Sequence, residues 1–140
     1  MTELEKFSGW EGKKMSFTVD EKVYNFFQEL SGDMNPLHTN AEFAKRKGFP
    51  QKVMYGNILN CFVSTLIGMC LPTPHIMIAA QDIKFKNPVY LNDRLDATIS
   101  VSEIFAIADS VELKFTFTNE SNLKVAVGKV IVKMLNDKTV

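Results

Sequence analysis

VMYGNILNCFVSTLIGMCLP, residues 53–72, predicts a helix that is apolar on almost every side. A helix with apolar residues all round is buried in a core rather than laid on a surface. Polar and small residues interrupt the run, and it is too short to cross a bilayer as a helix. Pro72 and Pro74 end the helix. A buried helix needs a partner that surrounds it, and the rest of the chain is expected to supply one.

The small and polar residues of this helix recur on one narrow stripe, since successive side chains are rotated by about 100°. The members of the stripe are Asn57, Asn60, Ser64 and Gly68. Either the stripe packs closely against a neighbouring sheet or helix, or its N-terminal part faces a polar cavity. The two cysteines, Cys61 and Cys70, lie too far apart on one helix to form a disulfide, so they are expected to be buried thiols.

The residues that follow the helix alternate between apolar and polar and are rich in β-branched and aromatic side chains. This pattern is typical of half-buried strands. It predicts an antiparallel meander in which Ile83, Phe85 and Val89 turn inward. The expected strands lie within residues 76–91, 94–108, 110–121 and 123–135.

The N-terminal part of the chain predicts a strand followed by two helices. Residues 15–19 form the strand, and Asp20 then has the position of an N-cap for a helix with apolar residues at helical spacing. SGDMNP, residues 31–36, ends that helix, because the residue before a proline avoids helical geometry. Asn40 is expected to cap a second, short helix that ends near Gly48.

Together these elements predict an α+β fold in which a curved antiparallel sheet wraps around the central helix. A length of 140 residues suits one domain, residues 1–140. The formal net charge is 0, so neither nucleic acid nor an anionic membrane is an expected partner. The start MTELEKFSGW has no apolar run and is unlike a signal peptide, which favours a cytoplasmic protein. No Cys and His spacing resembles a zinc site, so no metal is expected.

SGDMNPLH, residues 31–38, surrounds one acid and one imidazole with residues that bend the backbone. The bending residues are Gly32, Asn35 and Pro36. Asp33 alone is typical of a turn, and His38 alone is typical of a structural histidine. Held in one rigid frame, the two side chains become candidates for a catalytic acid–base pair.

At this point the chain resembles a known family. The stretch SGDMNPLHTNAEFAKRKGF is similar to the motif of MaoC-like, or (R)-specific, hydratases. The similarity continues in two later stretches, YGNILNCFVSTLIG and IKFKNPVYLNDRLDATISV. It runs from Phe17 to about Val132. The resemblance implies a hot-dog fold. It also implies an enzyme that interconverts trans-2-enoyl and (R)-3-hydroxyacyl thioesters, carried on coenzyme A or acyl carrier protein. No cofactor is implied, and a homodimer with the substrate tunnel at its junction is expected.

Carried over by position, the resemblance makes Asp33 and His38 the catalytic pair and assigns the backbone N–H of Gly56 to the thioester oxygen. The expected substrate-binding set is completed by Tyr55, Asn35 and Asn57. Tyr55 stands where the family usually has histidine, and Asn92 stands where it usually has glycine. Asparagine tolerates a left-handed turn. The tyrosine ring is expected to act mainly on which acyl group fits.

These residues suit the addition of water to a conjugated double bond. An acid and a histidine that share one water can remove its proton at C3 and supply a proton at C2. The charge that develops on the thioester oxygen needs a donor, and Gly56 lies at the start of the buried helix, where free N–H groups attract negative charge. Glycine also lets a carbonyl approach the backbone closely.

Two other functions remain open at this point. A thioesterase on the same fold would use an acid near the start of the helix, without the frame of residues 31–38. A non-catalytic subunit that binds acyl thioesters would keep the fold alone, and the tyrosine at position 55 favours it. The intact Asp33, His38 and Gly56 favour the hydratase.

Overall fold

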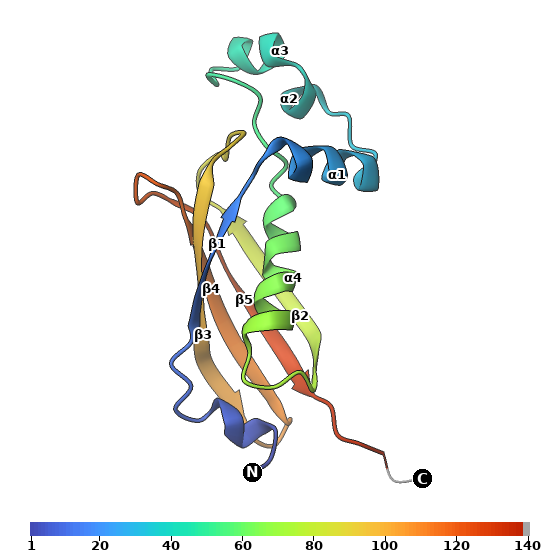
Figure 1. The fold of residues 1–140 in the computed structure, drawn as a ribbon, viewed down its shortest axis with the longest axis vertical. Helices are drawn as coiled ribbons and strands as arrows, with labels where there is room; N and C mark the ends of the chain where they lie inside the picture. Colours follow the sequence, from blue (N-terminus) through green and yellow to red (C-terminus); the bar gives the residue numbers. More distant parts are fainter. Residues whose placement is uncertain (139–140) are drawn as a thin grey trace.

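The computed structural model describes residues 1–138, in which one antiparallel sheet has the strand order β1-β3-β4-β5-β2 and a long helix lies against one of its faces (Figure 1). The order along the chain begins with a short 3-10 helix, a strand and three helices and continues with the long helix α4 and four strands. The elements are η1 (Leu4–Phe7), β1 (Lys13–Thr18), α1 (Glu21–Ser31), α2 (Pro36–Thr39), α3 (Ala41–Arg46), α4 (Ile58–Cys70), β2 (Ile76–Phe85), β3 (Arg94–Phe105), β4 (Ser110–Thr118) and β5 (Lys124–Met134).

The core lies between α4 and the inner face of the sheet. Val63 and Leu66 of α4 are fully buried, and the Phe17 ring of β1 stacks on the Phe62 ring with 4.4 Å between centroids. The sheet contributes the fully buried side chains of Leu95, Ala97, Leu113, Phe117, Val130 and Val132. Each large apolar side chain buried in this way stabilises the fold by about 1.5–3 kcal/mol. The prediction of a buried helix wrapped by an antiparallel sheet is therefore confirmed.

The ends of α1 are set by two residues. The Asp20 carboxylate accepts a hydrogen bond from Val23 N at 2.9 Å, which confirms the predicted N-cap. Gly32 ends the helix in the left-handed conformation, with φ 68°, and donates its N–H to the Gln28 carbonyl. Tyr24 is the buried side chain of this helix, whereas Leu30 is 80% exposed. The apolar spacing thus predicts the helix but does not identify the residue that anchors it.

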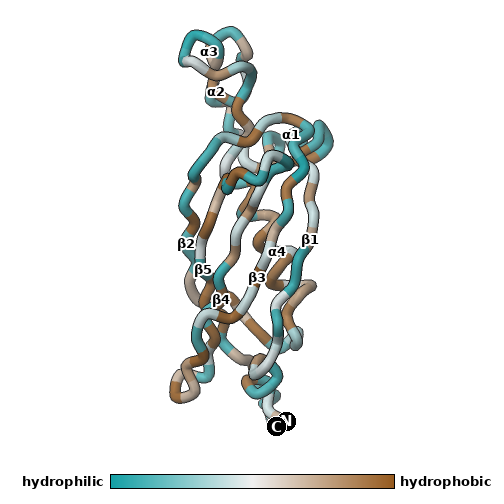
Figure 2. Tube along the Cα trace, turned by 90° about the vertical axis from the view of Figure 1, so that its left-hand side faces the viewer, coloured by the Kyte–Doolittle hydropathy of each residue, from teal (hydrophilic) through white to brown (hydrophobic). Residues whose placement is uncertain are grey.

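Between α1 and α4 the chain forms two short helices. Asn35 begins α2, which the sequence did not predict, by accepting a hydrogen bond from Leu37 N at 2.9 Å, with Pro36 at the first position. Asn40 caps α3 as predicted, through Phe43 N at 3.0 Å. Both helices project beyond the end of the sheet, and Figure 2 shows them as a mostly hydrophilic segment.

Two details of the sequence interpretation are wrong. β2 ends at Phe85 rather than at residue 91, because Pro88 has no N–H to continue a strand ladder. Phe85 is 52% exposed rather than turned into the core, since it lies at the end of an edge strand. Val89 is buried as predicted, although it lies outside any strand.

The polar stripe of α4 faces outward. Ser64 and Gly68 are exposed, and a Cβ atom placed on Gly68 would meet nothing within 4 Å. The stripe therefore does not pack closely against a sheet or helix within residues 1–138. Cys61 is exposed on the same side, which corrects its prediction as a buried thiol, while Cys70 is buried as expected. Ser64, Gly68 and Cys61 are exposed because they lie on the side of α4 that faces away from the sheet, where polar and apolar side chains alike are uncovered.

Among the described residues, no helix combines the length and the apolar character that a membrane crossing requires. The cytoplasmic location stays a prediction.

Candidate active site

The segment between α1 and α2 is held by short-range hydrogen bonds. The Asp33 carboxylate accepts a hydrogen bond from Asn35 N at 2.9 Å, which closes an Asx turn. The Asn35 side chain in turn caps α2, so that His38 lies on that helix in a defined direction. The hydroxyl of Thr39 donates to the Asn35 carbonyl at 3.2 Å. The turn residues that the sequence predicts to orient Asp33 and His38 therefore form the turn and the helix cap that such a role requires.

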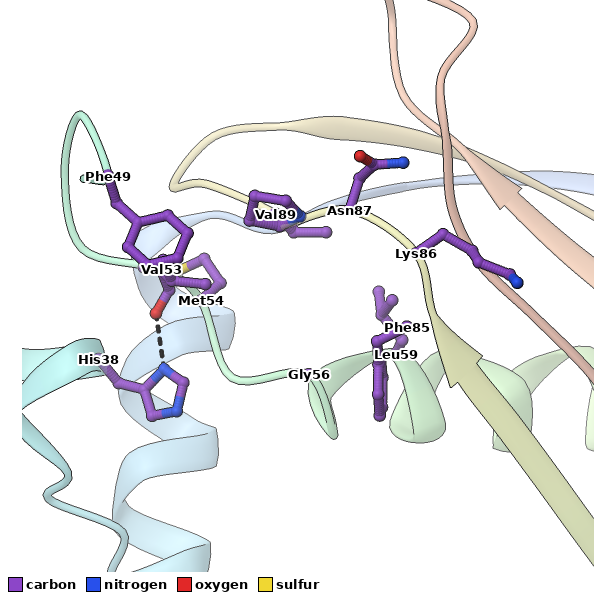
Figure 3. Close-up of a pocket in the computed structure, with 11 residues that line it drawn as sticks. His38, Phe49, Val53, Met54, Gly56, Leu59, Phe85, Lys86, Asn87 and Val89 are labelled. Carbon is purple, nitrogen blue, oxygen red and sulfur yellow. Dashed lines mark hydrogen bonds between the residues drawn. The ribbon is translucent and has the colours of Figure 1, made fainter. Parts of the chain in front are cut away.

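The His38 ring is fixed by the connector that precedes α4. Its Nδ1 atom lies 2.7 Å from the carbonyl oxygen of Val53 (Figure 3). A carbonyl oxygen only accepts hydrogen bonds, so Nδ1 carries the proton in the neutral ring. The Nε2 atom then has a free lone pair, which can take a proton from a reacting group.

His38 and Gly56 line one cavity of about 310 Å³. Its wall is mostly apolar, as is usual for pockets that bind small molecules. The other lining residues are Phe49, Val53, Met54, Leu59, Phe85, Lys86, Asn87, Pro88 and Val89. Figure 3 shows Leu59 and Phe85 beside Gly56, on the opposite side of the cavity from Phe49. The structure thus brings two of the predicted functional residues to one apolar cavity.

Gly56 lines this cavity, and its backbone N–H is not used in a hydrogen bond within the described residues. Its carbonyl accepts from Leu59 N at the entrance to α4. A Cβ atom at this position would lie 3.0 Å from Cε1 of Phe85. Glycine is therefore the residue that leaves room between the backbone and the Phe85 ring.

Asp33 does not line the cavity. Its side chain is exposed, and no hydrogen bond joins its carboxylate to the His38 ring in the part of the chain that the structure describes. Its main-chain oxygen accepts a hydrogen bond from the Tyr55 hydroxyl at 2.5 Å. The predicted catalytic pair is therefore linked through Tyr55 rather than by direct contact.

Tyr55 lies behind the site rather than in the cavity wall. The side chain is 3% exposed, and its ring packs on the His38 ring with 4.4 Å between centroids. Burial raises the pKa of the phenol above its ordinary value, and a hydrogen bond from Gln28 acts in the opposite direction. Tyr55 thus contacts both Asp33 and His38, while its effect on acyl-group choice stays a prediction.

The two asparagines of the predicted substrate-binding set also lie outside the cavity wall. The Asn35 side chain is used to cap α2. Asn57 is exposed, and its side-chain oxygen accepts from Asn60 at 2.8 Å, which in turn accepts from Gln81 at 2.6 Å. A binding role for these two residues therefore stays a prediction.

Tyr24 and Gln28 of α1 reach the site without any sequence signal of their own. Their contacts join residues far apart in the chain, such as Gln28 with Tyr55 at 3.1 Å.

No group of three His, Cys, Asp or Glu side chains within residues 1–138 could hold a metal ion. Asn92 adopts the left-handed conformation, with φ 70°, as its place in the motif predicts.

The model of the MaoC like domain matches residues 10–122. The chain belongs to this family. The (R)-specific enoyl-CoA hydratase of Rhodospirillum rubrum is 30% identical over 125 residues, which cover 88% of this chain and 82% of the relative. The (R)-specific enoyl-CoA hydratase of Aeromonas caviae is 28% identical, over 77% of this chain and 81% of the relative.

Solved structures confirm the predicted hot-dog fold. The (R)-hydratase of A. caviae involved in PHA biosynthesis superposes with a TM-score of 0.81 at 25% identity, over 89% of this chain and 94% of that chain. An R-hydratase from Pseudomonas aeruginosa, in its unliganded form, has a TM-score of 0.80 at 24% identity, over 92% of this chain and 83% of that chain. The fold and the family predicted from SGDMNPLH and the central helix are therefore confirmed.

Proposed function

We propose that this MaoC-like protein is an (R)-specific hydratase or dehydratase, which interconverts trans-2-enoyl and (R)-3-hydroxyacyl thioesters. One observation carries the proposal. The ring of His38, with Nδ1 bound to the Val53 carbonyl, and the free N–H of Gly56 line the same apolar cavity. A proton acceptor and an oxyanion donor are two of the functions that this reaction requires of one site.

In the hydration direction, the oxygen of a water forms a bond to C3 of the enoyl group. His38 and Asp33 together remove one proton from that water and supply one proton to C2, so the enzyme has no net change in protonation after the cycle. The π electrons move toward the thioester carbonyl, and the Gly56 N–H at the start of α4 binds the oxygen on which negative charge develops. One donor of this kind is worth about 3 kcal/mol in the transition state.

The names of relatives support this class of reaction. Two are (R)-specific enoyl-CoA hydratases, and a mitochondrial 3-hydroxyacyl-[acyl-carrier-protein] dehydratase of Arabidopsis thaliana is 25% identical over 79% of this chain. The prediction of a lyase that adds or removes water is confirmed at the level of class. We infer an acyl thioester on coenzyme A or acyl carrier protein as the substrate.

One assay separates this activity from the two alternatives. Purified protein is mixed with crotonyl-CoA, and the ultraviolet absorbance of the enoyl group and the amount of free thiol are followed together. Loss of absorbance without thiol release, with (R)-3-hydroxybutyryl-CoA as the product, is the expected result. Release of thiol would mean a thioesterase. No reaction across a panel of enoyl chain lengths on both carriers would mean a binding subunit.

We also infer a homodimer. β2 is an edge strand with β5 as its only neighbour in the sheet of residues 1–138, and it exposes Met77 and Ile78, of which Met77 is 55% exposed. On α4, Met69 is 77% exposed. Edge strands with apolar side chains pair with another chain readily, and a two-fold axis would cover this patch on both copies. Sedimentation should show a dimer, and an active species of 15.8 kDa would contradict the inference.

A further inference from the structure

Two tyrosine hydroxyls hold the backbone at both ends of the SGDMNPLH loop. The Tyr55 hydroxyl donates to the main-chain oxygen of Asp33 at 2.5 Å. The Tyr24 hydroxyl donates to the main-chain oxygen of His38 at 2.7 Å. Each of the two proposed catalytic residues is therefore held through its main-chain carbonyl group, in addition to the side-chain contacts of Asp33 with Asn35 and of His38 with Val53.

Gln28 connects the two tyrosines. Its Nε2 atom lies 3.2 Å from the Tyr24 oxygen and 3.1 Å from the Tyr55 oxygen. Both phenol protons are already donated to carbonyl groups, so both phenol oxygens must accept. An amide nitrogen has two protons, which is the number these two acceptors require. The three side chains therefore form one closed set of hydrogen bonds.

The two tyrosines of the network are buried and Gln28 is partly buried, whereas most of the loop that they hold is exposed. Tyr24 is 8% exposed and Tyr55 is 3% exposed, and their rings stack with 5.6 Å between centroids. Residues 31–36 are exposed, and no residue of α2 is buried. Little apolar burial holds this loop in place. Residues 37 and 38 also bond to Val53 of the connector, whereas the Tyr55 hydroxyl is the hydrogen bond that ties Asp33 to a buried side chain.

We propose that Tyr24, Gln28 and Tyr55 form a positioning network that sets the distance between Asp33 and His38 for catalysis. The proposal rests on the proposed function. None of the three lines the cavity in this structure: their hydroxyl and amide groups act through the backbone carbonyls of the proposed reacting residues. A displacement of about 1 Å in a reacting group can lower turnover by about a hundredfold, so such tethers act on kcat rather than on substrate affinity.

The test uses substitutions that remove single polar groups from the full-length protein. Tyr55→Phe and Tyr24→Phe each delete one hydroxyl and keep the ring, and Gln28→Leu deletes the connecting amide. Tyr90→Phe is the matched control, because its hydroxyl makes no hydrogen bond within residues 1–138 and its side chain does not line the cavity. For each variant, kcat and KM for enoyl hydration are measured together with the melting temperature.

Each of the three substitutions should lower kcat by about tenfold, the size expected when a hydrogen bond that orients a reacting group is lost. KM should stay within about threefold and Tyr90→Phe should match the wild type. Gln28→Leu added to the Tyr24→Phe, Tyr55→Phe double variant should lower kcat by less than about twofold, since the amide acts only through the two hydroxyls.

Three results would overturn the network. They are a wild-type kcat in Tyr55→Phe, a loss of kcat matched by loss of folded protein, or full additivity of Gln28→Leu with the tyrosine variants. These outcomes differ from failure of the proposed function. A wild-type protein without hydratase activity, or an Asp33→Asn variant as active as the wild type, would reject the function itself. An inactive Asp33→Asn beside a fully active Tyr55→Phe would reject the network alone.

Discussion

The Nδ1 atom of His38 lies 2.7 Å from the main-chain oxygen of Val53. This contact joins α2 to the connector that leads into α4, so the position of the imidazole depends on the same segment that places Gly56. A proton on Nδ1 leaves Nε2 as the basic nitrogen of the neutral ring. The proposed base and the proposed oxyanion donor are thus both placed by residues 53–56 of one connector.

We therefore predict that neutral His38 is the Nδ1–H tautomer. Two-bond ¹⁵N–¹H spectra of the ring report which nitrogen carries the proton, and His75, the other histidine, provides an internal comparison because its ring makes no hydrogen bond within residues 1–138. A spectrum with the proton on Nε2 of His38 would contradict the arrangement.

Gly56→Ala should lower kcat/KM by at least about tenfold, because the new methyl group occupies the space beside the N–H that we assign to the thioester oxygen. Unfolding free energy should change by less than about 1 kcal/mol. The half-exposed Phe85 ring, 3.0 Å from the new Cβ atom, can move slightly. Enzyme kinetics and chemical denaturation measure the two effects separately.

The double variant Gly56→Ala, Phe85→Leu distinguishes two reasons for that loss. If the methyl group blocks the substrate carbonyl, removal of the ring should leave kcat/KM low. Full recovery would mean that the contact with Phe85 was the cause and that the Gly56 N–H has no role in turnover.

Gly128→Ala should destabilise the sheet by about 3 kcal/mol and lower the melting temperature by about 10 °C. A Cβ atom there would overlap the main-chain oxygen of Asp82 on β2 and lie 2.5 Å from Cζ of Phe115 on β4. Backbone atoms of a paired strand cannot move aside without opening the ladder. Lys129→Ala, at an exposed neighbour, should change stability by less than about 0.5 kcal/mol, and an equal effect of both substitutions would disagree with this packing.

The main elements of the fold could be predicted because each depends on residues that are close together in the sequence. The all-round apolar character of residues 53–72 and the alternation after residue 76 predict the central helix and the strands, and Asp20 and Asn40 cap helices where their side-chain chemistry indicates. Phe85 was misplaced because alternation does not reveal that its strand ends there, at the edge of the sheet.

The side chains that hold the proposed active site in place could not be predicted from the sequence in the same way. Gln28 looks like an ordinary polar residue of a helix, yet it contacts Tyr55 across 27 positions of sequence. Tyr24 has no local partner that marks it as a tether for His38. Such contacts depend on how α1 packs over the connector to α4. The SGDMNPLH frame predicts the reacting pair, whereas the residues that hold the pair emerge only from tertiary structure.

Because the phenol of Tyr55 is buried, we predict that the free energy of unfolding falls in alkaline solution. Burial raises the pKa of its phenol above the ordinary value near 10. The native state therefore holds the neutral form more strongly than the unfolded chain does. The contribution of the neutral phenol to the free energy of unfolding is complete below about pH 10. It is lost as the pH rises through the raised pKa of the native state. The wild-type advantage in unfolding free energy over Tyr55→Phe should be constant from about pH 7 to 9 and fall above 10. A constant difference up to about pH 11.5 would argue against a buried, neutral phenol.

The most direct test of the account is the hydration rate of a saturating trans-2-enoyl thioester with Asp33→Asn and with His38→Ala, measured beside the control His75→Ala. If Asp33 and His38 transfer the protons, each substitution should lower kcat by at least about a hundredfold while the far-ultraviolet circular dichroism and the melting temperature remain near those of the wild type. His75 lies outside the cavity wall, and its replacement should leave kcat within about twofold. Near-normal turnover by either Asp33→Asn or His38→Ala would contradict the catalytic pair.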